Sequence, residues 1–363
     1  MTVQPLAGFR ALETQHCVTG SMRHVYGYNG HDVSEEMLLG VGGGVGFIYW
    51  HQQGMAPFIG GRANARGEFE PLAGRRTGVK IEAHTTASAR KAEQAMLQML
   101  QGGQPVMVHC DMGYLPYFDF GDVEYHFGGH VVVVCGCDAQ ARETLVADRD
   151  GVHAVSMEDL EKARGSTHQP FPPRHTWYTF DFAGQRPPTV AEVRQAIAEQ
   201  ARGMLEPPIR NFGVPGIRKA AQRVPKWAEG MDADALRWAL FNTYIFISPV
   251  GGSGGGIFRT MFSRFLREAA GVMGDARLEE SAEEFRRIGE RWEDLGEWFR
   301  RTSEAPEPAA LLGECAGAFR ELAEMEEGAW GRVRGRGGEG ERGRQGDKET
   351  RRGGEHGWAG LTD

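Results

Sequence analysis

The feature that most constrains the fold is a pair of apolar segments separated by a short turn, within residues 129–148. The first segment, residues 129–137, contains four consecutive valines, and the second, residues 143–148, has three consecutive apolar residues between polar ones. Valine is enriched in strands, and the five residues 138–142 between the segments are typical of a hairpin turn. Because a lone hairpin is marginally stable, other elements must pack on it.

Changes of composition divide the chain into three regions. Residues 1–184 mix short strand-like segments with helices, whereas residues 189–330 show the i, i+3, i+4 apolar spacing of amphipathic helices. Between them, two consecutive prolines and a helix-capping threonine, Thr189, indicate a linker. The last region, residues 331–363, holds eleven Gly and eight Lys or Arg with little to bury, so we expect disorder there. The predicted fold class is α+β, with a helical C-terminal domain.

Composition also excludes several functions. The formal net charge is −8, which argues against nucleic acid as the main partner. The longest purely apolar segment, residues 131–135, is far shorter than the ~20 residues of a membrane-spanning helix. The five cysteines form no C-x-x-C pair or zinc cluster, and the N-terminus lacks the pattern of a signal peptide. We therefore expect a cytoplasmic protein without a metal or other cofactor.

A candidate catalytic site combines the hairpin with a cysteine more than 100 residues upstream. Apolar residues at helical spacing follow Cys17, so this thiol is expected near a helix N-terminus, where the positive dipole end lowers its pKa. His130 and Asp148 are expected as diagonal neighbours on one face of the hairpin, within reach of an imidazole–carboxylate hydrogen bond. A thiol, a base and a carboxylate that orients the base are the groups of a papain-like site.

The expected hairpin register leaves a second carboxylate as an alternative. If the turn is centred on Gln140, Asp148 and Asp150 both project from the face that carries His130. Asp148 is the preferred orienting group, and Asp150 is the alternative. The expected cross-strand pairs are Cys137–Glu143, Val132–Asp148 and His130–Asp150.

These residues resemble a known family. His16-Cys17, Gly129-His130 and Asp148 resemble the bacteriocin-processing cysteine peptidases, and a longer match over most of residues 10–330 resembles the butirosin-biosynthesis H protein (BtrH-like) family. The resemblance implies a papain-like fold with a helical C-terminal domain, and acyl transfer from a carrier-protein thioester to an amine. The longer match includes Thr19-Gly20-Ser21, Ser34-Glu35-Glu36, residues 40–47, residues 255–259 and residues 265–270.

One position departs from that resemblance. Peptidases of this kind place a glutamine about six residues before the cysteine as an oxyanion donor. This chain has Ala11 at that position, and Gln15 lies too near the cysteine. The backbone N–H of Cys17 is the expected oxyanion donor, and the second donor stays open.

The resulting interpretation is a cysteine acyltransferase of specialised metabolite or antibiotic biosynthesis. Cys17 attacks the thioester of a phosphopantetheine-bearing acyl carrier protein, His130 accepts the thiol proton and later activates a small-molecule amine acceptor, and Asp148 orients His130. One alternative is a peptidase or amidohydrolase with the same three residues and water as the acceptor. The other is a binding or scaffold protein without catalysis.

Other segments have two interpretations each. Residues 40–46 lie in helix-to-strand order, which favours close backbone approach near the site over nucleotide binding. The glycines of residues 251–256, followed by Arg259, form either a hinge or a phosphate site. The aromatic segment 112–120 either lines an acyl or acceptor pocket or packs over the core. A basic cluster is either a docking patch for the carrier protein or a solvated loop, and it comprises Arg62, Arg66, Arg75, Arg76 and Lys80.

Overall fold

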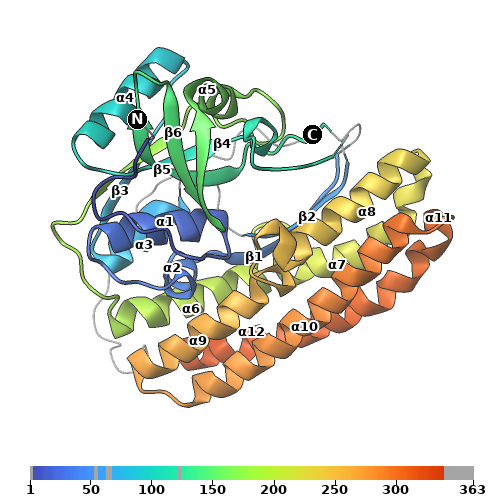
Figure 1. The fold of residues 1–363 in the computed structure, drawn as a ribbon. Coiled ribbons are helices and arrows are strands. Elements are labelled where there is room, and N and C mark those ends of the chain that lie inside the picture. Colours follow the sequence, from blue (N-terminus) through green and yellow to red (C-terminus); the bar gives the residue numbers. More distant parts are fainter. Residues whose placement is uncertain (1–2, 53–55, 63–67, 122–123, 339–363) are drawn as a thin grey trace, which may run out of the picture.

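The computed structural model describes residues 3–52, 56–62, 68–121 and 124–338 (Figure 1). A six-stranded sheet with helices on both faces forms the N-terminal part, and long helices packed side by side form the C-terminal part. The predicted α+β class, with a sheet followed by a helical region, is confirmed. Within the described ranges, no helix combines the length and apolar character that crossing a bilayer requires.

The six-stranded sheet is antiparallel throughout, with the strand order β3-β8-β4-β5-β6-β7. Strand β8 comes last in the sequence but lies between β3 and β4. Residues about 30 positions after the hairpin therefore complete the same sheet. The strands are β3 (Lys80–His84), β4 (Val106–Cys110), β5 (His130–Asp138), β6 (Glu143–Asp148), β7 (Gly151–Ser156) and β8 (Trp177–Asp181).

Strand β5 is covered on both faces, which explains its continuous run of valines. Val131 and Val133 belong to the core cluster that includes α1 (Cys17–Tyr28). Val132 and Val134 belong to a second cluster, on the side of α4 (Ala89–Gln101) and α5 (Met157–Gly165). Successive side chains of a strand point to opposite faces, so one apolar run serves both cores.

The predicted hairpin forms, but its register differs at the tip. Asp138 pairs with Glu143, whereas we expected Cys137 there. The Asp138 carboxylate accepts hydrogen bonds from the backbone N–H groups of Gln140 and Ala141, which tightens the turn by one residue. A β-bulge between Val134 and Gly136 absorbs the difference. Beyond the bulge the pairing follows the predicted register, and Val133 pairs with Ala147.

The predicted pair His130–Asp150 is wrong. Strand β6 ends at Asp148, which pairs with Gly151, the first residue of β7. Arg149 and Asp150 therefore form a two-residue turn and leave the face that carries His130.

A two-stranded ribbon, β1 (Val45–Trp50) and β2 (Phe58–Arg62), packs on the helical region rather than on the large sheet (Figure 1). Strand β1 contacts α6 and α7, and β2 contacts α8. The ribbon follows α2 (Glu35–Val41) and precedes α3 (Phe69–Thr77). The remaining helices are α6 (Val190–Leu205), α7 (Gly213–Arg223), α8 (Ala233–Ile247), α9 (Arg259–Met273), α10 (Arg277–Glu304), α11 (Pro308–Leu311) and α12 (Cys315–Gly338).

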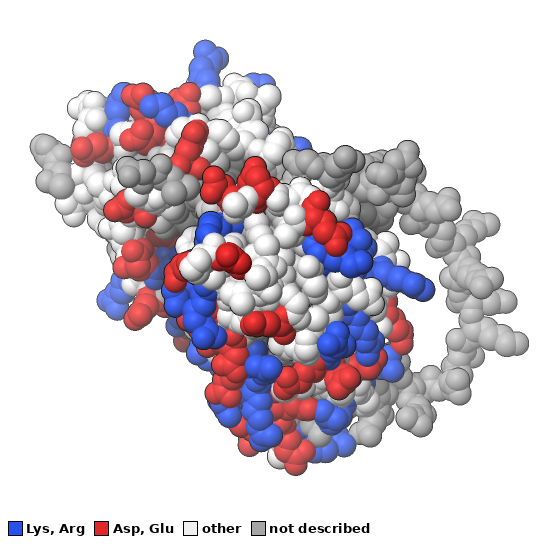
Figure 2. Space-filling view, turned by 90° about the vertical axis from the view of Figure 1, so that its right-hand side faces the viewer, with Lys and Arg blue, Asp and Glu red and all other residues white. Residues whose placement is uncertain are grey.

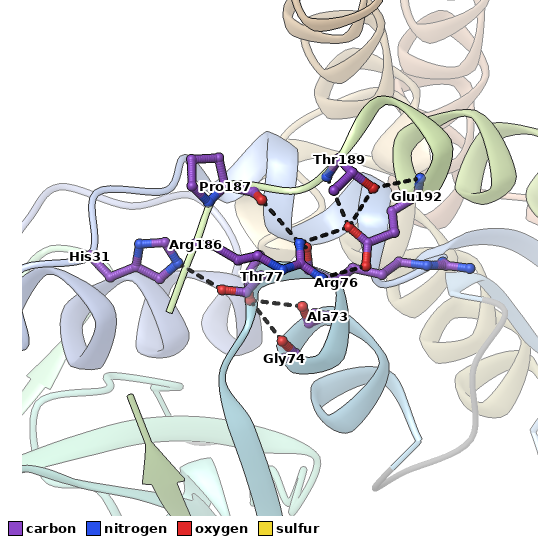
Figure 3. Close-up of polar contacts among 9 residues, drawn as sticks. All are labelled: His31, Ala73, Gly74, Arg76, Thr77, Arg186, Pro187, Thr189 and Glu192. Carbon is purple, nitrogen blue, oxygen red and sulfur yellow. Dashed lines mark hydrogen bonds and ion pairs between the residues drawn. The ribbon is translucent and has the colours of Figure 1, made fainter. Parts of the chain in front are cut away.

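Polar contacts hold the segment between the two regions in place (Figure 3). Thr189 caps α6 as predicted, in a reciprocal capping box with Glu192. Arg186 donates to the Glu192 carboxylate at 2.8 and 2.7 Å, and its backbone N–H donates to the carbonyl of Thr77 at 3.0 Å. The linker is therefore fastened to the end of α3 as well as to α6.

The expected disorder does not begin at Gly331. Helix α12 continues to Gly338, and Val333 is fully buried. Arg332 forms an ion pair with Glu284 of α10, so this turn packs on its neighbours. The rest of the predicted tail, residues 339–363, lies outside the described residues.

A buried ion pair joins three helices to the ribbon. Arg259 and Glu326 are both fully buried, with 2.7 Å between Arg259 Nε and Glu326 Oε1. The indoles of Trp292 and Trp330 donate to the same carboxylate, and Arg259 Nη1 donates to the carbonyl of Gly46 in β1 at 2.7 Å. Because these contacts engage the guanidinium, the predicted phosphate site at residues 251–256 and Arg259 is wrong. Residues 252–256 are themselves buried, which argues equally against a hinge.

This pair generates a stability prediction. Arg259→Met leaves Glu326 buried without its cation, so we expect it to lower the free energy of unfolding by about 3–5 kcal/mol. The control is Arg218→Met, because Arg218 forms an exposed ion pair with Glu327 and its loss is expected to cost less than about 1 kcal/mol. Urea denaturation measures both, and equal losses would contradict the special role of the buried pair.

Candidate active site

Cys17 is the first residue of helix α1, as predicted. The preceding residue, His16, has extended backbone and is the N-cap of the helix, with 3.4 Å between its Nδ1 and the backbone nitrogen of Thr19. Taken as a whole residue, Cys17 is partly buried. Its position at the helix N-terminus places it in the field of the unpaired N–H groups of the first turn.

The structure brings His130 and Asp148 together, as predicted. His130 begins β5, Asp148 ends β6, and 2.7 Å separates His130 Nε2 from Asp148 Oδ2, with both side chains buried. Helix α1 packs on these two strands, and His130 is one of the groups that lower the pKa of the Cys17 thiol. Since Nε2 contacts the carboxylate, Nδ1 is the ring nitrogen available to the thiol. The structure therefore brings cysteine, histidine and aspartate into one neighbourhood.

Asp148 has two further hydrogen bonds that hold it in place. The Tyr117 hydroxyl donates to Oδ2 at 2.9 Å, and the backbone N–H of Arg149 donates to Oδ1 at 2.8 Å. Tyr117 stacks on His153, with 3.9 Å between ring centroids. Sequence reasoning placed Tyr117 in an aromatic segment without foreseeing that its hydroxyl binds the carboxylate.

The alternative carboxylate, Asp150, lies elsewhere. Its side chain is 73% exposed and accepts a hydrogen bond from His153 at 2.8 Å. The turn between β6 and β7 directs Asp150 to His153 and away from His130. The geometry therefore favours Asp148 beside His130.

Electrostatics favour an ion pair between thiol and imidazole. Burial alone lowers the pKa of His130, but the charge and hydrogen bond of Asp148 raise that pKa to about 10. Burial raises the pKa of the Cys17 thiol, but the imidazoles of His16 and His130 together hold that pKa well below its ordinary value. Burial likewise disfavours the Asp148 carboxylate, yet His130 keeps the pKa of Asp148 below its usual range. At neutral pH these directions give thiolate, imidazolium and carboxylate.

A second imidazole, that of His16, lies beside the thiol. Arg62 Nη1 donates to His16 Nε2 at 3.0 Å, so in the neutral ring the proton is on Nδ1, 3.1 Å from Thr19 Oγ1. Burial lowers the pKa of His16 and the charge of Arg62 adds to the decrease, whereas the Cys17 thiolate opposes it. Sequence reasoning named His16 only as a neighbour of the cysteine, and its contact with Arg62 has no sequence signal.

Glu35 anchors the backbone that precedes the nucleophile. Its buried carboxylate accepts the N–H of Gln15 at 2.8 Å, the N–H of His16 at 3.1 Å and the hydroxyl of Thr19 at 3.0 Å. Burial raises the pKa of Glu35, and these three donors oppose the increase. The motif Ser34-Glu35-Glu36 thereby fixes the helix start that carries Cys17.

Gln15 is directed toward the helical region. Its Oε1 accepts from Arg264 of α9 at 2.9 Å, and its Nε2 donates to Glu36 at 3.4 Å. These contacts agree with the expectation that Gln15 does not serve as the oxyanion donor. The backbone N–H of Cys17 stays the predicted donor.

The aromatic segment 112–120 packs over the site. Phe118 lies edge-on to His130, with ring centroids 5.4 Å apart. Tyr117 covers the Asp148 side as described. The segment thus shields the imidazole–carboxylate pair from water.

The predicted basic docking patch does not form as one surface. Arg76 is buried and forms a 2.6 Å ion pair with Glu199, and Arg62 faces His16 and the ring of Phe69. Lys80 pairs with Glu82, and Arg75 is exposed. Arg66 lies outside the described residues. Helix packing, which a count of charges ignores, separates these side chains.

The other four cysteines differ from Cys17 in electrostatics. Burial raises the pKa of Cys110, Cys135 and Cys315 to about 12, and it also raises the pKa of Cys137. Among the residues that the structure describes, no group of His, Cys, Asp or Glu is arranged to hold a metal ion.

The fold and the site define an α+β protein with a helix-borne cysteine beside a strand-borne histidine and aspartate. Residues 16–149, which contain all three, match the family model of butirosin biosynthesis protein H, N-terminal. This match confirms the resemblance to the butirosin-biosynthesis H family over that region, and the resemblance to the bacteriocin-processing peptidases stays a prediction. Residues 158–333 match a domain of unknown function, DUF4872. No curated protein matches the chain.

The ion pair predicts selective labelling of Cys17. Iodoacetamide is expected to alkylate Cys17 faster than the other four cysteines at pH 7, because a thiolate reacts and a thiol does not. His130→Ala removes the imidazolium, so the pKa of Cys17 rises and labelling at pH 7 falls, with recovery above pH 9. Peptide mass spectrometry after timed alkylation measures each site, and uniform rates over all five cysteines would contradict the prediction.

The geometry also ranks the two carboxylates. Asp148→Asn removes the charge that raises the pKa of His130, so that pKa should fall and turnover should drop by a large factor, on the order of 10³–10⁴. Asp150→Asn is the matched control in the next turn, and we expect little change because its partner is His153. NMR titration of His130 together with turnover measurements tests both variants, and the reverse ranking would move the orienting role to Asp150.

Proposed function

We propose that the chain is a cysteine-dependent acyltransferase of specialised metabolite biosynthesis, with a papain-like catalytic domain in residues 1–184 and a helical domain in residues 189–330. The observation that carries the proposal is the neighbourhood of Cys17, His130 and Asp148, in which a 2.7 Å hydrogen bond holds the imidazole beside a helix-terminal thiol. The family match supports a role in antibiotic biosynthesis.

The proposed reaction has two steps. In the first, the Cys17 thiolate attacks the carbonyl of a thioester on the phosphopantetheine of an acyl carrier protein, and the carrier thiolate leaves with the proton of His130. In the second, an amine attacks the Cys17 thioester and gives its proton to the neutral His130. The amide leaves, and the thiolate–imidazolium pair is restored. The backbone N–H of Cys17 faces the developing oxyanion.

The surroundings of the pair support transfer to an amine over hydrolysis. An acyl-enzyme that waits for an amine must be protected from water. Phe118 lies against His130, the Tyr117 hydroxyl is bonded to Asp148, and both acidic and basic partners of the site are buried. A peptidase or amidohydrolase with the same residues would instead need an ordered water at the thioester.

An intact-mass experiment tests the reaction. Acyl thioesters of N-acetylcysteamine, which carry the reacting end of phosphopantetheine, are expected to add one acyl mass to the protein at Cys17. The adduct should decay slowly in buffer and rapidly when a primary amine is added. Cys17→Ser should give no adduct, and Cys137→Ser, which removes another partly buried cysteine, should behave as the wild type.

Each outcome assigns a function. Decay that is as fast without amine as with it would indicate a hydrolase. The absence of any adduct, in the presence of rapid iodoacetamide labelling, would exclude acyl thioesters as substrates. The absence of both the acyl adduct and the rapid iodoacetamide labelling would indicate a protein that binds without catalysis.

A further inference from the structure

The start of helix α9 contains an unusual backbone conformation. Ile257 and Phe258 have φ of 50° and 74°, so two consecutive non-glycine residues occupy the left-handed region. For a β-branched residue this conformation is a clear outlier. Such a corner persists only where surrounding contacts hold it.

Two contacts hold this corner. Arg259 Nη1 donates to the carbonyl of Ile257 at 2.8 Å, and its other nitrogens bind Glu326. Gly61 of strand β2 packs so closely that an added Cβ would lie 2.7 Å from the Ile257 carbonyl oxygen. The buried ion pair and the ribbon therefore impose the conformation, and the corner then directs Phe258.

Phe258 contacts the residue next to the nucleophile. Its ring meets the His16 imidazole edge-on, with 5.0 Å between centroids and an interplanar angle of 88°. Phe258 is 6% exposed. Arg62, the neighbour of Gly61 in the chain, binds Nε2 of the same imidazole. His16 is thus held by the helical region through Phe258 and by the ribbon through Arg62.

We propose that Phe258 is a positioning residue of the active site, through which the helical domain holds the His16 imidazole beside the Cys17 thiol. The inference rests on the proposed role of Cys17 as nucleophile and adds that the second domain is part of the catalytic apparatus. The edge contact restricts rotation of the His16 ring, and Arg62 fixes its tautomer. Both restrictions keep the ring dipole in one orientation relative to the thiolate.

Replacing Phe258 leaves all the charged groups around the thiol in place. Cys17 is faced by the two imidazoles of His16 and His130, and the ring of His16 is near Arg62 and Arg149. Glu35 is bonded to the backbone of the same turn. Because Phe258 carries no charge, its replacement changes the reactivity of Cys17 only through packing.

The test compares two buried phenylalanines, Phe258 in front of helix α9 and Phe262 in its first turn. Phe258→Met keeps most of the volume but removes the ring edge, and Phe258→Leu is a second variant with the same loss. Phe262→Met is the matched control, because Phe262 is fully buried among Phe265, Phe285 and Trp330 and does not contact His16. Each variant is assayed for Cys17 alkylation between pH 5 and 10, for acylation kinetics and for melting temperature.

We expect the alkylation profile of the Phe258 variants to move to higher pH by up to about one pKa unit, so that alkylation at a pH below the midpoint is up to about tenfold slower. The maximal acylation rate should fall while KM changes little. Phe262→Met should lower the melting temperature at least as much and leave the alkylation profile unchanged. If Phe262→Met slows Cys17 alkylation as much as the Phe258 variants do, the effect comes from general packing, and the proposal is overturned.

A double-mutant cycle tests whether Phe258 acts through His16. His16→Asn keeps a side chain able to cap α1 but removes the ring. If the proposal is right, Phe258→Met has its effect in the wild type and almost none in the His16→Asn background. Additive effects would overturn it, as would an unchanged alkylation profile in Phe258→Met. If wild-type Cys17 itself shows an ordinary thiol profile, the proposed nucleophile fails instead, so the two failures are distinguishable.

Discussion

The buried ion pair between Arg259 and Glu326 is the interaction on which the rest of the structure depends. Removing two charges from water is costly unless every remaining donor and acceptor is satisfied. Here two tryptophan indoles donate hydrogen bonds to the carboxylate, and the carbonyls of Gly46 and Ile257 accept hydrogen bonds from the guanidinium. The pair therefore ties α9, α10 and α12 to the ribbon, and it fixes the corner that places Phe258 against His16.

The site assigns different electrostatic roles to two imidazoles beside one thiol. His130 has a carboxylate partner, so it retains its proton and forms an ion pair with the thiolate. His16 is buried and has a guanidinium partner, and both lower its pKa, while the thiolate opposes the decrease. Two imidazoles beside the thiol lower its pKa, which suits a nucleophile that must stay ionised at neutral pH. Burial alone would raise the pKa of the thiol.

Several expectations failed where an isolated segment was given a role that its neighbours control. Arg259 looked free to bind phosphate, and Arg76 looked like part of a docking surface, yet each is buried against a carboxylate more than 60 residues away. Asp150 was placed on the hairpin face by counting residues from the turn. The tightened turn and the bulge changed the register only at the tip, but β6 ended before Asp150. Helix α12 continued past Trp330 because Val333 finds a buried position.

Local patterns in the sequence determined the strands, the start of α1 and the pairing of His130 with Asp148. Strand alternation, helix spacing and short turns act over a few residues, so they can be read without knowledge of the rest of the chain. The parts of the site that come from distant segments were decided by the tertiary structure alone. Glu35, Arg62, Tyr117 and Phe258 reach His16 or Asp148 across separations from 19 to more than 200 residues. Contacts of this kind leave no periodic signal, because packing of the two regions and the buried ion pair, rather than local propensity, set which side chains meet.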